Sequence, residues 1–263
     1  MDFGMPTLIE HNNLEETAAL CHELGLDFIE LNMNLPQYQI EALENIDKFQ
    51  RIADQYQLYY TIHLDENLNV CDFNRAVANA YLDTIRRTIE VAKKLRAPIL
   101  NMHMNHGIYV TLPDRKVKLY EKYNDHYMAD IKKLKEMCDT AVRGTNIKIA
   151  IENTDGYCEY EKKAIEYLLE SDAFTLTWDI GHSHVCDNVD VPFIMEHVDQ
   201  LKHFHIHDAS GKKNHLTLGT GEIDLRERLL IAKGCGARCV IETKTIESLR
   251  TSIDWLRINQ PLQ

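Results

Sequence analysis

Short runs of β-branched and aromatic residues alternate along this chain with longer stretches in which apolar residues recur every three or four positions. Runs of the first kind are typical of buried strands, and stretches of the second kind are typical of amphipathic helices. The short runs predict eight strands, at residues 1–6, 27–33, 58–63, 98–103, 147–153, 175–179, 201–207 and 238–243.

The segments between these strands predict helices. Apolar residues at 14, 18, 21 and 24 share one helical face, and Gly25 follows them, a residue type that often ends a helix. The same spacing of apolar residues occurs at 82–95, 131–141, 165–169, 225–232 and 246–256.

Regular alternation of strand and helix predicts parallel strands joined by right-handed crossovers. Eight such units favour a closed (β/α)8 TIM barrel, and with no low-complexity linker in the chain we expect one domain over residues 1–263. The alternative is an open doubly wound sheet. A dinucleotide-binding sheet of that type would carry a Gly-rich turn after its first strand, and this chain has none there.

Alternate side chains of a strand point to opposite faces of the sheet. In the strand at 147–153, the isoleucines 147, 149 and 151 share one parity and Glu152 has the other. The apolar set should face the helices, and the polar set should face the barrel axis at the catalytic, carboxyl ends of the strands. The strand-end residues that this rule turns inward are His63, His103, Glu152, Asp179, His205 and Glu242.

Three carboxylates buried this close together would repel one another unless a cation neutralised them. Glu152, Asp179, His205 and Glu242 therefore predict a divalent-metal site rich in oxygen ligands, suited to Mn²⁺, Mg²⁺ or Co²⁺, with Zn²⁺ as a further candidate. Such an ion would polarise a substrate carbonyl and stabilise an enediolate. Glu152 and Glu242 would move the proton from opposite sides, as in sugar isomerisation or epimerisation.

Further polar residues near the predicted site have two interpretations. His63, His103, His182 and His215 could hold a second metal or bind sugar hydroxyls, and Lys213 could contact a phosphate or carboxylate. Glu30 shares the inward parity and is expected to pair with a cation inside the barrel. In contrast, His184 and His207 are expected to be exposed loop residues, and Trp178 is expected to pack under the helices.

Charge and cysteine content narrow the class of protein. The formal net charge of -12 argues against a nucleic-acid partner. The chemistry of the predicted metal site, and not the charge, points to a small carbohydrate substrate. No apolar run is long enough to predict a membrane span. The seven cysteines form no CxxC pair, which suits a reducing cytoplasm and a role as buried filler. A homo-oligomer is compatible with a barrel of this size.

Several motifs in the second half of the chain occur together: Ile151-Glu152-Asn153, Trp178-Asp179-Ile180-Gly181-His182, His205-Ile206-His207-Asp208, the stretch from His215 to Asp224, and Ile241-Glu242. With these motifs the chain resembles the xylose isomerase-like barrel superfamily, which contains sugar phosphate isomerases and epimerases and also endonuclease IV. The first half supports the resemblance only through His63 and His103.

The resemblance implies two alternative sites. In the branch of D-tagatose 3-epimerase, a Glu-Asp-His-Glu quartet binds one divalent ion and its glutamates act as acid and base. Glu152, Asp179, His205 and Glu242 match that quartet, and His182 matches a substrate-contacting position.

Endonuclease IV, a multi-zinc phosphodiester hydrolase, offers the alternative. Eight of its nine zinc ligands are matched by His63, His103, Glu152, Asp179, His182, His205, His215 and Glu242. The ninth, an aspartate two residues before His215, is Lys213 in this chain. The substitution places a cation where a third zinc would need an anionic ligand.

Overall fold

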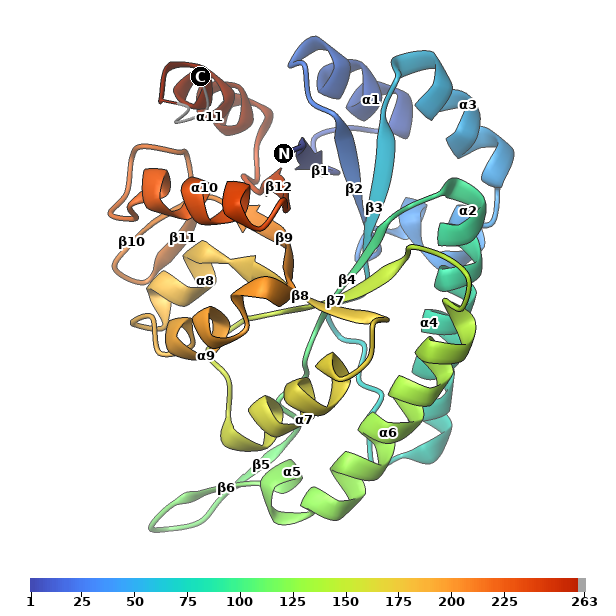
Figure 1. Cartoon of the computed structure of the whole chain (residues 1–263), viewed down its shortest axis with the longest axis vertical. Helices are drawn as coiled ribbons and strands as arrows, with labels where there is room; N and C mark the ends of the chain where they lie inside the picture. The colour runs from blue at the N-terminus through green and yellow to red at the C-terminus, as the bar shows by residue number, and fades with distance from the viewer. Residues whose placement is uncertain (260–263) are drawn as a thin grey trace.

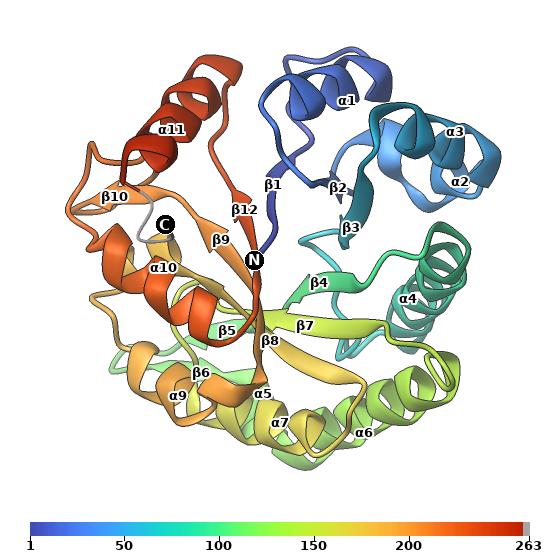
Figure 2. The same ribbon diagram turned by 45° about the horizontal axis from the view of Figure 1, so that its top comes forward.

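Eight parallel strands form a closed barrel in the computed structural model, which describes residues 1–259. The helices surround the strands on the outside (Figure 2). Around the barrel, neighbouring strands follow the order β1-β12-β9-β8-β7-β4-β3-β2, so the last strand closes against the first. The barrel strands are β1 Phe3–Pro6, β2 Phe28–Asn32, β3 Tyr59–His63, β4 Ile99–His103, β7 Lys148–Glu152, β8 Phe174–Asp179, β9 Leu201–Ile206 and β12 Arg238–Ile241. The predicted TIM barrel is confirmed.

The first helix begins and ends at residue types that favour helix ends. Asn13 caps the first helix by accepting the backbone N–H of Glu16 at 2.9 Å, and Gly25 follows the helix at a φ of 68°. The helices are α1 Leu14–Glu23, α2 Ile40–Leu43, α3 Ile46–Tyr56, α4 Arg75–Leu95, α5 Leu119–Lys122, α6 Asn124–Ala141, α7 Glu159–Leu169, α8 Ile180–Val185, α9 Val191–Glu196, α10 Leu225–Gly234 and α11 Ile246–Asn259, with 3-10 turns η1 Pro36–Tyr38 and η2 Val198–Gln200. None of these helices is long and apolar enough to cross a membrane, as judged over residues 1–259.

Two small hairpins and five helices, α2, α3, α5, α8 and α9, were not predicted from the pattern. Hairpin β5–β6 (Tyr109–Thr111 and Lys116–Lys118) extends beside α5, as Figure 1 shows, and β10–β11 (Asp208–Ser210 and Lys213–Leu216) follows β9. Helix α3 has only Phe49 and Ile52 buried, and α8 and α9 have six residues each, so their apolar periodicity is weak.

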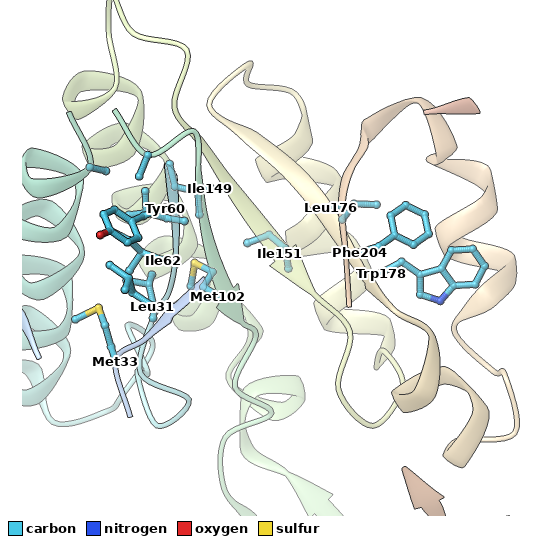
Figure 3. Packing of buried hydrophobic residues seen from close by; sticks show 14 of the residues in the cluster. Leu31, Met33, Tyr60, Ile62, Met102, Ile149, Ile151, Leu176, Trp178 and Phe204 are labelled. Atoms are coloured by element: carbon cyan, nitrogen blue, oxygen red, sulfur yellow. The ribbon is translucent and has the colours of Figure 1, made fainter. Parts of the chain in front are cut away.

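The parity rule correctly separates the core from the barrel interior. Figure 3 shows the outer face of the strands, where Leu176, Trp178 and Phe204 project from β8 and β9 toward the helices. Trp178 is fully buried, with its ring centroid 5.7 Å from that of Phe204, so its predicted place under the helices is confirmed. Residues of the opposite parity, such as Thr177 and Asp179, are left to face inward.

Leu176→Ala should lower the free energy of unfolding by about 2–5 kcal/mol, because the fully buried Leu176 would leave a cavity between barrel and helices. The matched control is Leu230→Ala on α10, where the side chain is 53% exposed. Urea unfolding followed by circular dichroism measures both. Equal losses in the two variants would show that the outer face of β8 is not part of the packed core.

Candidate metal centre

Four side chains from the carboxyl ends of four strands meet inside the barrel. Glu152 ends β7, Asp179 ends β8, His205 lies in β9, and Glu242 follows β12. One potential ligand atom from each residue lies within 4.8 Å of those from the other three. The strand register explains why these side chains meet, because His205 pairs with Asp179 of β8 on one side and with Val240 of β12 on the other. Glu242, two residues past Val240, has the same parity.

A buried carboxylate behind His205 fixes the orientation of its ring. Nε2 of His205 lies 2.7 Å from Oε1 of Glu30, and Nε2 of His203 lies 2.8 Å from Oε2. Thr61 donates to the same Oε2 at 2.9 Å. Glu30 thus pairs with two imidazoles inside the barrel, as expected of a partner-binding carboxylate, although an imidazole is a cation only when both of its nitrogens are protonated. A proton on Nε2 of His205 leaves the Nδ1 edge of the ring facing the quartet.

Nδ1 of His205 faces all three carboxylates. It lies 3.0 Å from Oε2 of Glu242, 3.2 Å from Oε1 of Glu152 and 3.8 Å from Oδ2 of Asp179. Burial alone would raise the pKa values of Glu152 and Glu242, but the neighbouring His205 outweighs burial and lowers both well below the usual range. Both glutamates are thus ionised at neutral pH, the state in which a carboxylate binds a cation.

Contacts from His207 and from the backbone of His182 fix the position of the Asp179 carboxylate. Nε2 of His207 lies 3.0 Å from Oδ2, and the backbone N–H of His182 donates to Oδ1 at 2.7 Å. The backbone N–H of His215 donates to Nδ1 of His207 at 2.8 Å, so the other ring nitrogen carries the proton that points at Asp179. The backbone N–H of Asp179 itself donates to Oδ1 of Asn153 at 2.8 Å.

Three more histidines surround the outer oxygens of this group. Nε2 atoms of His63 and His103 lie 3.3 and 3.1 Å from Oε2 of Glu152. Nδ1 of His182 lies 3.4 Å from Asp179 and 3.5 Å from Glu152. Burial alone would lower the pKa of His63, but the Glu152 carboxylate outweighs burial and raises it to about 9.

A cavity of about 400 Å³ opens above this group of side chains. Glu152 and Glu242 line it, whereas Asp179 and His205 are not among the lining residues and lie behind them. The cavity is polar, with acidic, basic and imidazole groups on its walls. Its lining is His63, Glu66, His103, Glu152, Thr154, Asp155, His182, Val185, Asn214, His215, Glu242 and Lys244.

Known proteins share this architecture. A model of the Xylose isomerase-like TIM barrel family matches residues 18–259. The chain belongs to this family. It is also 28% identical over 215 residues to an uncharacterised protein of Methanocaldococcus jannaschii, covering 78% of this chain and 79% of that protein.

Solved structures extend the likeness to the whole xylose isomerase-like barrel. A D-tagatose 3-epimerase-like protein superposes with a TM-score of 0.76 at 23% identity, covering 98% of this chain and 96% of that one. A protein named IolI, solved with a bound zinc atom, superposes with a TM-score of 0.74 at 16% identity, covering 98% of each chain. At these identities the likeness establishes the fold.

The structure places most of the site residues predicted from the sequence at one cavity. His63, His103, His182 and His215 all line it, but Lys213 is exposed on β11 and its neighbour Asn214 lines the cavity instead. In a regular strand Lys213 and His215 would share a face, but the backbone turns at His215, whose φ is 54°, so alternation does not hold along β11.

The sequence reasoning missed Lys244 and misplaced His207. Nζ of Lys244 lies 2.7 Å from Oε1 of Glu242 at the rim of the cavity, and its spacing of two residues from Glu242 was the available signal. The expectation that His207 is exposed is wrong. His207 is completely buried inside the barrel, where its Nε2 faces the Asp179 carboxylate. The same expectation for His184 is also wrong, because His184 lies half-buried in α8, 3.1 Å from Glu222.

Asn153→Ala should destabilise the protein by about 1–3 kcal/mol at pH 7.5, and by less at pH 5. Nδ2 of Asn153 lies 2.9 Å from Oδ2 of Asp190, a buried carboxyl whose pKa is raised by burial. Loss of this donor penalises the ionised carboxyl, so stability returns as the pH falls through the raised pKa and Asp190 is protonated.

Urea unfolding of wild type and variant between pH 5 and 7.5 measures this pH dependence. Asn34→Ala is the matched control, because Asn34 also donates to a carboxylate, Glu66 at 2.8 Å, but is exposed. A loss in Asn153→Ala that is the same at both pH values would contradict the role of Asn153 as the donor to Asp190.

Proposed function

We propose that this protein is a divalent-metal-dependent sugar or sugar-phosphate isomerase or epimerase. The observation that carries the proposal is the convergence of Glu152, Asp179, His205 and Glu242 within 4.8 Å beneath a polar cavity. The names of two structural neighbours support it, one a D-tagatose 3-epimerase-like protein and the other a protein with bound zinc.

The side chains of the quartet fit a divalent cation. Oε2 of Glu242 is buried and, among the described residues, has no hydrogen-bond partner, although His205 is nearby. A buried carboxylate oxygen without a partner is costly, and a cation would satisfy it. Three carboxylates and one imidazole suit Mn²⁺, Co²⁺ or Mg²⁺, with Zn²⁺ as a further candidate. When bound, such an ion would polarise a substrate carbonyl and stabilise negative charge on its oxygen.

Ligand protonation should make cation binding depend on pH. Burial alone would lower the pKa of His205, but Glu152, Glu30 and Glu242 outweigh burial and raise it well above its usual value. A cation that takes the Nδ1 position must therefore release a proton from His205.

Glu152 and Glu242 are the residues suited to transfer protons. They line the cavity, while Asp179 and His205 lie behind them, so a bound substrate can touch the two glutamates directly. They come from β7 and β12, with β8 and β9 between them, so they approach the cavity from different sides. One glutamate would take the proton from the carbon next to the substrate carbonyl, and the other would return a proton from its own side.

The walls of the cavity favour a small polyol. Imidazoles of His63, His103, His182 and His215 line the cavity and offer hydrogen bonds to hydroxyl groups. Lys244 supplies one positive charge at the rim, which suits a phosphate or carboxylate group on the substrate. Glu66 and Asp155 also line the cavity, and their carboxylates would repel a polyanionic backbone.

A second candidate function follows from His103. Its buried Nε2 has no hydrogen-bond partner among the described residues and lies 3.1 Å from Glu152, with His63 on the same oxygen. These three residues could hold a second cation, as a multi-zinc phosphodiester hydrolase of the endonuclease IV type would require. The acidic walls and the net charge of -12 favour the first candidate.

Exchange of substrate hydrogen with solvent tests the first candidate. Protein loaded with Mn²⁺, Co²⁺, Mg²⁺ or Zn²⁺ is incubated in D₂O with a panel of ketoses, aldoses and their phosphates, and proton NMR follows deuterium uptake next to the carbonyl. We expect uptake with at least one sugar, and a loss of about 10²–10⁴-fold in Glu152→Gln and in Glu242→Gln.

Glu66→Gln is the control for the exchange experiment, because Glu66 lines the same cavity but is not part of the quartet. Elemental analysis of each variant separates a lost proton donor from a lost metal. If no sugar takes up deuterium while an oligonucleotide with an abasic site is cleaved in the presence of zinc, the hydrolase candidate replaces the isomerase.

Glu30→Gln should weaken Mn²⁺ binding by about 10- to 100-fold without unfolding the protein. The glutamine keeps the shape and an acceptor oxygen for His205 but removes the charge that polarises the ring. Calorimetric titration gives the affinity, and Glu41→Gln on the exposed surface is the control. Equal affinity in wild type and Glu30→Gln would show that Glu30 does not act through His205.

A further inference from the structure

A second group of metal-ligating side chains lies outside the quartet, where the loop after β4 meets the start of α7. His106 belongs to that loop, Cys158 is the N-cap of α7, and Glu161 lies in its first turn. One ligand atom of each lies within 4.8 Å of the other two. The proposed function makes no use of these three residues.

The ring of His106 is oriented for ligation. Its Nε2 forms an ion pair with Oδ1 of Asp155, so this nitrogen carries a proton and Nδ1 faces the other members of the group. The hydroxyl of Tyr160 donates to the backbone carbonyl of His106 at 2.9 Å and fixes the loop at this point. A histidine backed by a carboxylate in this way is a common form of metal ligand in proteins.

Glu161 aims an unpartnered oxygen into the group. The side chain is completely buried, and its Oε2 accepts the backbone N–H of Cys158 at 2.7 Å. Its Oε1 has no hydrogen-bond partner, although Nδ1 of His106 lies 2.5 Å away. The contact between these two atoms does not meet the geometry of a hydrogen bond, so the buried oxygen is left unsatisfied. An ion bound between them would satisfy it.

The sulfur of Cys158 is the third potential ligand of the group. Sγ lies 3.9 Å from Nδ1 of His106, close to the ~3.6 Å edge between sulfur and nitrogen in a tetrahedral zinc site. The pair formed by His106 and Glu161 would have to open by about 1 Å to reach the corresponding nitrogen–oxygen edge. Nζ of Lys118 lies 2.6 Å from Sγ, and this exposed side chain at the end of β6 is free to leave when another cation arrives.

We propose that His106, Cys158 and Glu161 form a second metal site, which takes Zn²⁺ or a chemically similar ion such as Co²⁺ and is independent of the quartet. Sulfur, nitrogen and oxygen donors together select such ions over Mg²⁺ or Ca²⁺. Three protein ligands leave one position for water. The bound ion would tie the loop after β4 to α7 and hold Asp155 at the wall of the cavity.

Cobalt is the probe that distinguishes this site from the quartet. A cobalt–thiolate bond gives a charge-transfer band in the near ultraviolet, and none of the quartet residues carries sulfur. Titration of metal-free, fully reduced protein with Co²⁺ should produce this band in wild type and in Asp179→Asn. The band should be absent in Cys158→Ser and at least tenfold weaker in His106→Ala at the same cobalt concentration.

Two further variants keep the result interpretable. Cys186→Ser is the matched control, because Cys186 is also half-buried and near the cavity, and it should keep the band. Lys118→Met removes the cation that neighbours Cys158 and should bind cobalt at least as tightly as wild type. Zn²⁺ added afterwards should displace the cobalt and bleach the band.

The proposal is overturned if wild type takes up cobalt without a thiolate band, or if the band survives in Cys158→Ser. Loss of the band in Asp179→Asn would also overturn it, since the sites would then not be independent. Circular dichroism of Cys158→Ser and His106→Ala verifies the fold. Failure of the sugar-exchange experiment leaves these outcomes unchanged, because the cobalt band does not depend on catalysis.

Discussion

The contact between Glu30 and Nε2 of His205 is the constraint on which the barrel interior depends. A fully buried carboxylate needs hydrogen-bond donors, and His203, His205 and Thr61 supply them from β9 and β3. In meeting that need, the structure turns the other edge of His205 toward three more carboxylates. The orientation of the His205 ring thus connects the buried Glu30 contacts to the quartet beneath the cavity.

This layering separates two kinds of polar residue within one barrel. Glu30 and His203 are inaccessible and paired, so they can be kept in fixed protonation states. Glu152 and Glu242 line the cavity and have more than one neighbour each, so their partners can change when a ligand enters. Asp179 and His205 stand between the two layers, and contacts from His207, Asn153 and Glu30 hold them there.

Strand parity allowed the sequence to predict the fold and the quartet. Because side chains alternate strictly in a strand, the isoleucines at 149 and 151 were enough to place Glu152 inside, and the same rule placed Asp179, His205 and Glu242. The rule fails where the backbone leaves the strand. Lys213 points outward on a hairpin that the apolar pattern did not predict. His207, just past β9, keeps the inward parity of His203 and His205, and only the expectation that it is an exposed loop residue was wrong.

Contacts between loops were the least predictable part of the structure. His106 and Cys158 are 52 residues apart, and neither belongs to a periodic segment. Their proximity depends on the pairing of β4 with β7, which brings the loops after both strands to the same edge of the barrel. Sequence spacing carries no sign of such a contact until the order of strands around the barrel is known.

The position of β12 between β9 and β1 has a consequence for how the protein is made. This strand both closes the barrel and delivers Glu242, the last member of the quartet along the chain. During synthesis, Glu152, Asp179 and His205 leave the ribosome first, and the proposed ligand set stays incomplete until β12 pairs with β9. The nascent chain would therefore gain its full affinity for a cation only at the moment when the first and last strands meet.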